Sequence, residues 1–151
     1  MTLAIVTTEP KHIRELAGNL RDQDREEIIA FGMTPHKALW RSYRQAMMSR
    51  TALVDDAVAA VWGVSGCPFG KVGRIWLLTS PASERVKTAF VREGKAEITD
   101  MLAIYDELRG YVDARYYRAI RLLDVLGFAI SGAFPFGPLG APFRQFTIRR
   151  H

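Results

Sequence analysis

The stretch YVDARYYRAIRLLDVLGF, residues 111–128, has the pattern of a strand, a helix and the start of a new strand. Tyr111-Val112 is a short β-favouring run. The segment after it places four apolar residues on one helical face: Ala119, Leu122, Leu123 and Leu126. Gly127 can take the left-handed conformation that ends a helix, and Phe128 then returns the chain to the core. We predict a strand over 111–114, a helix over 116–126 and a strand over 128–133.

The rest of the chain alternates between the same two kinds of element. A strand over 2–7 precedes helices over 12–20 and 22–32, and Thr34-Pro35 is a suitable N-cap and first-turn pair for a helix over 36–48. Strands over 51–54 and 58–64 form a hairpin around Asp55-Asp56. The remaining expected elements are a strand over 74–79, a helix over 83–108, a loop over 135–140 and a strand over 143–148. This order predicts one α/β domain over 1–151, a mixed sheet with helices on both faces.

Composition narrows the class of protein. About half of the residues are apolar and a quarter are charged, as in globular domains. The single cysteine, Cys67, excludes an internal disulfide. We expect no signal peptide and no membrane span, because no long apolar run occurs. The net charge of +5 has two interpretations, a solvated basic surface or contact with a polyanion. Specific nucleic-acid binding is not indicated, since the basic residues are scattered.

With its elements in this order, the chain resembles the GNAT acyltransferases. The segment 119–123 followed by Leu126-Gly127-Phe128 is the most specific part of the likeness. The resemblance implies the GNAT fold, in which a helix packs on a mixed central sheet through its leucines. It also implies acetyl-CoA as a possible cofactor.

A second resemblance covers nearly the whole chain. The segments NLRDQDREEI, TPHKALWRSYRQA, VWGV, WLLTS, the opening stretch and FRQF occur in this order. Together they are similar to GNAT-like internal virion proteins of short-tailed bacteriophages. This likeness implies a phage origin and a place in the host cytoplasm or the virion, without secretion. It also implies other virion proteins, or further copies of this chain, as partners.

The GNAT resemblance implies a cofactor loop, and this sequence departs from it. The family binds the pyrophosphate of coenzyme A on the pattern (Gln/Arg)-x-x-Gly-x-(Gly/Ala), where backbone N–H groups approach the phosphates. After Ser80-Pro81 this chain has Glu84 at the first position and Lys87 at the first glycine. We therefore expect a degraded loop, with positive side chains as its remaining attraction for an anion. The candidate cofactor-binding residues are Leu77, Leu78, Thr79, Arg85, Lys87, Thr88 and Ala89.

The catalytic pattern of the family is also incomplete. Leu123 stands where many GNAT enzymes have a tyrosine that protonates the leaving thiolate. Tyr116 is the candidate replacement and its neighbour Tyr117 could also substitute, with a packing or surface role as the alternative for both. Asp113 is the candidate general base, with a capping role as its alternative. No histidine or cysteine spacing indicates a metal site.

Two functions of different classes follow from these patterns. The first is a virion-associated or assembly protein on a GNAT scaffold with degenerate chemistry. The alternative is an acetyl-CoA-dependent N-acetyltransferase that acts on an amine. A host-directed binding protein that modifies nothing is a third option. The aromatic loop with Phe134, Phe136 and Phe143 would either contact a partner or fold over the core of its own domain.

Overall fold

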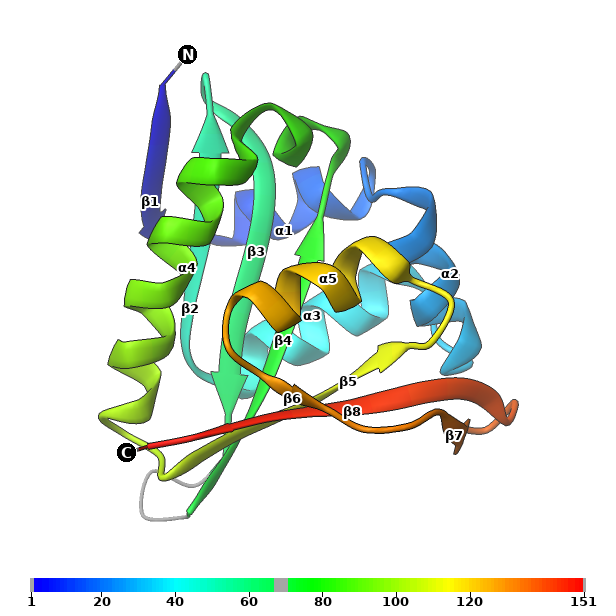
Figure 1. Cartoon of the computed structure of the whole chain (residues 1–151). Helices are drawn as coiled ribbons and strands as arrows, with labels where there is room; N and C mark the ends of the chain where they lie inside the picture. The colour runs from blue at the N-terminus through cyan, green and yellow to red at the C-terminus, as the bar shows by residue number, and fades with distance from the viewer. Residues whose placement is uncertain (1, 67–70, 151) are drawn as a thin grey trace.

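The computed structural model describes residues 2–66 and 71–150, so Cys67 lies outside the described residues. The helices are α1 (Pro10–Ala17), α2 (Asp22–Ala30), α3 (Pro35–Gln45), the 3-10 helix η1 (Pro81–Val86), α4 (Lys87–Leu102) and α5 (Tyr117–Val125). The strands are β1 (Leu3–Thr7), β2 (Ala46–Val54), β3 (Ala57–Ser65), β4 (Val72–Thr79), β5 (Glu107–Asp113), β6 (Ala129–Ile130), β7 (Phe134–Phe136) and β8 (Ala141–Arg149). Figure 1 shows these elements as one twisted sheet flanked by helices.

The strands form a mixed sheet in the order β1-β2-β3-β4-β5-β8-β6, with β7 paired to β8. Among the described strands, β4 and β5 are the only parallel neighbours, and the other pairs are antiparallel. A parallel pair needs a crossover, and η1 with α4 provides it. The parallel pair lies in the middle of the sheet, and this position matters for the site described below.

Helices cover both faces of the sheet, as predicted. One core contains apolar side chains of α4 and α5 packed on the sheet, including Met101 and Leu123. The other contains side chains of α1, α2 and α3, including Leu16, Ile28 and Leu39. In Figure 1, α4 and α5 lie in front of the strands and α1, α2 and α3 lie behind them. The 3.6-residue apolar spacing of α1, α3 and α5 explains why each of these helices buries one side.

The opening stretch folds as predicted from its pattern. β5 is followed by α5, and Gly127 takes φ 101° directly after the helix. The Phe128 N–H donates to the Leu123 carbonyl at 3.0 Å, which closes the helix end. Phe128 is buried and its ring meets Phe146 edge to face, with centroids 5.1 Å apart. Any residue other than glycine at position 127 would strain this turn, because a Cβ atom disfavours a positive φ.

Several element boundaries differ from the sequence predictions, three of them as follows. The helix expected over 83–108 ends at Leu102, and β5 already begins at Glu107, because Glu107 is held by Arg109 and Arg149 within the sheet. The helix expected over 36–48 ends at Gln45, where β2 begins. The strand expected over 128–133 is only Ala129–Ile130.

The aromatic loop folds over the core of its own domain. β7 lies within the loop expected over 135–140, where Phe136 stacks on Tyr111 with ring centroids 4.3 Å apart. Phe143 on β8 is fully buried against Phe31 and Phe136. These contacts tie the C-terminal hairpin to α2, which forms one wall of the cavity described next.

Candidate active site

β4 and β5 separate at the centre of the sheet. Their pairing covers Val72, Gly73 and Arg74 against Glu107, Leu108 and Arg109, and the described residues show no pairing beyond them. Backbone N–H groups of a strand alternate between its two edges. The Thr79 N–H faces the open edge, where it donates to Asp24. The Leu77 N–H, two residues earlier, therefore faces the same opening.

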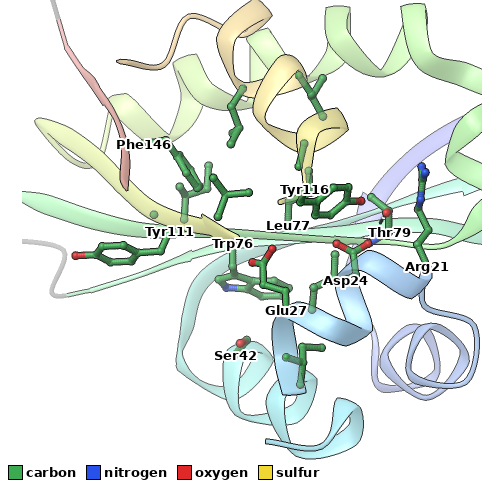
Figure 2. A pocket seen from close by; sticks show the side chains of 18 of the residues that line it. Arg21, Asp24, Glu27, Ser42, Trp76, Leu77, Thr79, Tyr111, Tyr116 and Phe146 are labelled. Carbon is green, nitrogen blue, oxygen red and sulfur yellow. Dashed lines mark hydrogen bonds between the residues drawn. The ribbon is translucent and has the colours of Figure 1, made fainter. Parts of the chain in front are cut away.

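A cavity of about 1150 Å³ passes through this opening. Its walls come from α2 and α3 on one face of the sheet and from η1, α4 and α5 on the other. Apolar side chains line it beside a few polar and charged groups, which is the usual make-up of a small-molecule site. Figure 2 shows Asp24 and Glu27 extending from α2 toward the strands, where Thr79 and Tyr116 lie.

Asp24 is a buried carboxylate held by the end of β4. It accepts hydrogen bonds from the Thr79 N–H at 3.0 Å and from the Thr79 hydroxyl at 2.6 Å. Burial raises the pKa of Asp24 to about 6, and the two bonds from Thr79 limit the rise. Asp24 is therefore mostly ionised at neutral pH and places a negative charge in the opening.

Glu27 lies one helical turn after Asp24 on the same face of α2. Its carboxylate accepts a hydrogen bond from the Asp113 N–H at 3.3 Å, so it sits at the edge of β5. Burial raises the pKa of Glu27 to about 8, and the negative charges of Asp24 and Asp113 add to this effect. A carboxylate with this pKa can exchange a proton near physiological pH.

Tyr116 lies at the N-terminal end of α5 and lines the same opening. Its side chain is buried, and burial together with the charge of Asp24 raises its pKa to about 12. The hydroxyl therefore keeps its proton at every pH at which the protein would work. Its neighbour Tyr117 is 76% exposed and points away from the core.

Glu84 marks the opposite end of the cavity, on η1. Three basic side chains form ion pairs with its carboxylate: Arg21, Lys87 at 2.8 Å and Arg118 at 2.5 Å. The hydrogen bond from Lys87, with those from Arg21 and Arg118, lowers the pKa of Glu84 to about 2. Three positive charges against one negative leave this rim with net positive charge, although the sequence predicts a negative one from Glu84 alone.

Several of the predicted cofactor-binding residues line the cavity. Leu77, Leu78 and Thr79 form its β4 wall, and Lys87 lies at its rim. Arg85, Thr88 and Ala89 are not among the cavity-lining residues. Their role in binding a cofactor stays a prediction.

Of the two predicted catalytic residues, only Tyr116 lines the cavity. Burial opposes ionisation of Asp113, but Arg115, which donates at 2.7 and 2.9 Å, holds the pKa of Asp113 below its ordinary value. Asp113 meets the site through its backbone N–H, which donates to Glu27. A carboxylate already paired in this way is a poor proton acceptor near neutral pH.

Sequence reasoning missed the two acidic residues of α2. The partner of Asp24 lies 55 residues away and that of Glu27 lies 86 residues away. One signal was present: Asp24, Glu27, Ile28 and Phe31 have the spacing of a single helical face. Two carboxylates among apolar residues on one face indicate buried acids, which require a partner or a function.

Neither a group of metal ligands nor a membrane-spanning helix is found in the part of the chain that the structure describes. No group of three or more His, Cys, Asp or Glu side chains within residues 2–66 and 71–150 is arranged to hold a metal ion. Over the same ranges, no helix combines the length and apolar character needed to cross a membrane.

The sequence matches no model of a known protein family, and no curated protein matches it either. Among solved structures, a GNAT-family acetyltransferase from Bacillus anthracis superposes with a TM-score of 0.72 at 12% identity, covering 99% of this chain and 95% of that one. An aminoglycoside acetyltransferase in complex with coenzyme A and kanamycin gives 0.67 at 14% identity, with coverage of 99% and 95%.

A third similar structure is a spermidine N-acetyltransferase from Vibrio cholerae in complex with CoA and spermine. Its TM-score is 0.65 at 12% identity, with 97% of this chain and 95% of that chain covered. At this level of identity the likeness concerns the fold. The protein therefore has the GNAT acetyltransferase fold, an eight-stranded mixed sheet with helices on both faces.

Proposed function

We propose that this protein is an N-acetyltransferase that transfers the acetyl group of acetyl-CoA to an amine. The observation that carries the proposal is Glu27, a carboxyl group with a pKa of about 8 in the opening between β4 and β5. A general base works best when its pKa is near the working pH. Burying an acid beside Asp24 opposes folding, and such an arrangement is characteristic of functional sites.

The cavity has features that suit the donor molecule. The rim around Glu84 has net positive charge from Arg21, Lys87 and Arg118, which complements phosphate groups. The Leu77 N–H faces the opening, where a carbonyl oxygen would accept its hydrogen bond. The degraded cofactor loop expected from the sequence is therefore offset, in this proposal, by side-chain cations in place of glycine N–H groups.

Glu27 and Tyr116 carry out the two proton transfers of the proposed reaction. Acetyl-CoA supplies a thioester, whose C–S bond breaks as the amine nitrogen bonds to the carbonyl carbon. Glu27 accepts a proton from the ammonium group, while the Leu77 N–H stabilises negative charge on the carbonyl oxygen. Tyr116 donates its hydroxyl proton to the departing sulfur. Two protons leave the nitrogen in all, of which one replaces the proton lost by Tyr116 and the other reaches solvent.

The test combines binding with turnover. Acetyl-CoA is titrated into the protein by calorimetry, and free thiol is then measured with a panel of amines. We expect a Kd in the micromolar range, about −8 kcal/mol, and saturable thiol release in the wild type. Glu27→Gln should bind acetyl-CoA normally without releasing thiol, whereas Glu26→Gln, an exposed neighbour outside this cavity, should behave as wild type. Absence of acetyl-CoA binding would refute the proposal.

A virion-associated role with weak chemistry is the second candidate. It is carried by the sequence segments that resemble phage virion proteins, and the structural comparisons lend it no support. That the partners are other virion proteins or further copies of this chain also stays a prediction from the sequence. Mass spectrometry of purified particles tests this role, because the protein would be found in them at a fixed copy number.

A further inference from the structure

We propose that the amine acceptor also carries a carboxylate several bonds away from its amine. This inference rests on the proposed N-acetyltransferase function and concerns the half of the cavity beside α2 and α3. That half has an acidic end, Asp24 and Glu27, and a basic end, Arg41, Arg74 and Arg109, all of which line the cavity. An acceptor with one charge of each sign complements both ends.

Strand alternation places the basic end on the α2 and α3 side of the sheet. Leu77 and Leu108 belong to the core of α4 and α5, on the other face. Side chains one position away point to the opposite face. Trp76 on β4 and Arg109 on β5 therefore face α2 and α3. Arg74, two residues before Trp76, points to the same face of the sheet. The packing of Trp76 with the apolar residues of α1 and α3 confirms this assignment.

The basic end has more positive charge than its neighbours neutralise. Arg74 and Arg109 are direct partners in the parallel register of β4 and β5. Arg109 pairs with Glu107 at 2.6 Å, but Glu107 also pairs with Arg149 at 2.8 Å. Arg74 forms no ion pair with any described residue. Like charges in directly opposed strand positions are unfavourable, so a bound anion would relieve them.

α3 brings a third cation to the same place. Ala38, Arg41, Ser42 and Gln45 line the cavity and have the spacing of one helical face. Arg41 forms no ion pair within residues 2–66 and 71–150. Arg44, on the same helix, does not line the cavity. Arg41 and Arg44 therefore form a matched pair for an experiment.

Trp76 lies between the two ends, two residues after Arg74 and three before Thr79. Its indole packs closely against β3 at Gly63, where a Cβ would lie only 2.7 Å from the Trp76 Cζ2 atom. The Trp76 Nε1–H is buried and has no hydrogen-bond partner among the described residues. An unpaired buried donor in a residue that lines a cavity is unusual.

The spacing of the ends sets the size of the acceptor. Arg109 and Asp113, whose N–H holds Glu27, are separated by about 13 Å along β5. The Arg109 guanidinium is held by Glu107, which lies on the side of Arg109 away from Asp113 in the strand, so the Arg109 side chain does not bridge this distance. An α-amino acid, with a single carbon between its charges, is too short to span it. The predicted class is an amine joined to a carboxylate by a rigid or aromatic body, or the N-terminus of a short acidic peptide.

The test uses three compounds of one shape: 4-(aminomethyl)benzoate, its neutral amide and benzylamine. Turnover is followed as thiol release, and binding is followed separately by calorimetry in the presence of CoA. We expect kcat/KM for the benzoate to exceed that for the amide by roughly fivefold to tenfold, mainly through KM. Arg41→Gln and Arg74→Gln should each lower kcat/KM for the benzoate more than for benzylamine, and so remove much of this preference. Arg44→Gln should retain the preference.

The outcomes separate this inference from the proposed function. Thiol release with equal kcat/KM for benzoate and amide would overturn the inference and leave the function standing. Preferential binding of the benzoate without thiol release would support the inference and count against the function. Retention of the preference in both Arg41→Gln and Arg74→Gln would overturn the assigned basic end.

Discussion

Glu27 and Glu84 line the same cavity, yet their carboxyl groups are shifted in opposite directions. Burial beside two other carboxylates raises the pKa of Glu27 to about 8, whereas Lys87, Arg21 and Arg118 lower that of Glu84 to about 2. Residue type alone does not distinguish them. In the proposed function, these surroundings suit one glutamate to proton exchange and the other to organising positive charge, which is how paired carboxyl groups divide their roles in enzyme sites.

The largest expected effect is the loss of the base. Glu27→Gln keeps the shape and the hydrogen bond from the Asp113 N–H but cannot take a proton. We expect kcat to fall by about 10²–10⁴. In the wild type, kcat/KM should rise as the pH passes through about 8, and this rise should be absent in the variant. An unchanged pH–rate profile in Glu27→Gln would end its assignment as base.

Tyr116→Phe tests the acid. Removal of the hydroxyl should lower kcat by about 10², with acetyl-CoA affinity nearly unchanged in calorimetry. Tyr117→Phe is the control, because Tyr117 is its exposed neighbour. Full activity in Tyr116→Phe would mean that this tyrosine only packs.

The shift of Glu27 also predicts how stability depends on pH. Its folded pKa, about 8, lies above the ordinary value of 4.5, so the folded state holds a proton that the unfolded state loses. Stability therefore falls as the pH rises from about 4.5 to 8. Glu27→Gln should be more stable than wild type by roughly 4–5 kcal/mol at pH 8.5 and nearly equal at pH 4.5, since each pKa unit corresponds to about 1.4 kcal/mol. Urea unfolding at the two pH values measures this difference, and equal stability at both would contradict the shift.

The smallest expected effect concerns Glu84. Glu84→Gln removes the negative charge that pairs with Arg21, Lys87 and Arg118, so CoA should bind roughly fivefold more tightly, with a steeper salt dependence. Glu93→Gln on α4 is the control, since its contact with Arg92 is long, at 3.9 Å. Weaker binding would mean that Glu84 holds the three cations in their productive positions.

Local signals explain why much of the fold could be predicted. The hairpin around Asp55-Asp56, the strand before Ser80 and the turn at Gly127 each depend on residues within a few positions. The sequence predicts a start of β5 at residue 111, after its true start at Glu107, because Glu107 and Arg109 do not lie in a strand-like apolar run. Their pairing with β8 makes these residues part of the strand. Tertiary contact outweighs propensity at such positions.

The site was predicted less completely for the same reason. The β4 wall and Tyr116 follow from the order of elements, which a family resemblance supplies. Asp24 and Glu27 become meaningful only when folding brings Thr79 and Asp113 beside them. Likewise, Glu84 alone indicates repulsion of phosphate, and only the convergence of three distant cations reverses that expectation.

The most direct test of the central claim is a ¹³C NMR titration of the glutamate carboxyl groups. Glu27→Gln and Glu84→Gln identify the two resonances, and no substrate is needed. We expect one carboxyl to titrate at about 8 and to vanish in Glu27→Gln, and another to titrate at about 2 and to vanish in Glu84→Gln. Titration of Glu27 at the ordinary glutamate value near 4.3 would contradict its role as a poised base.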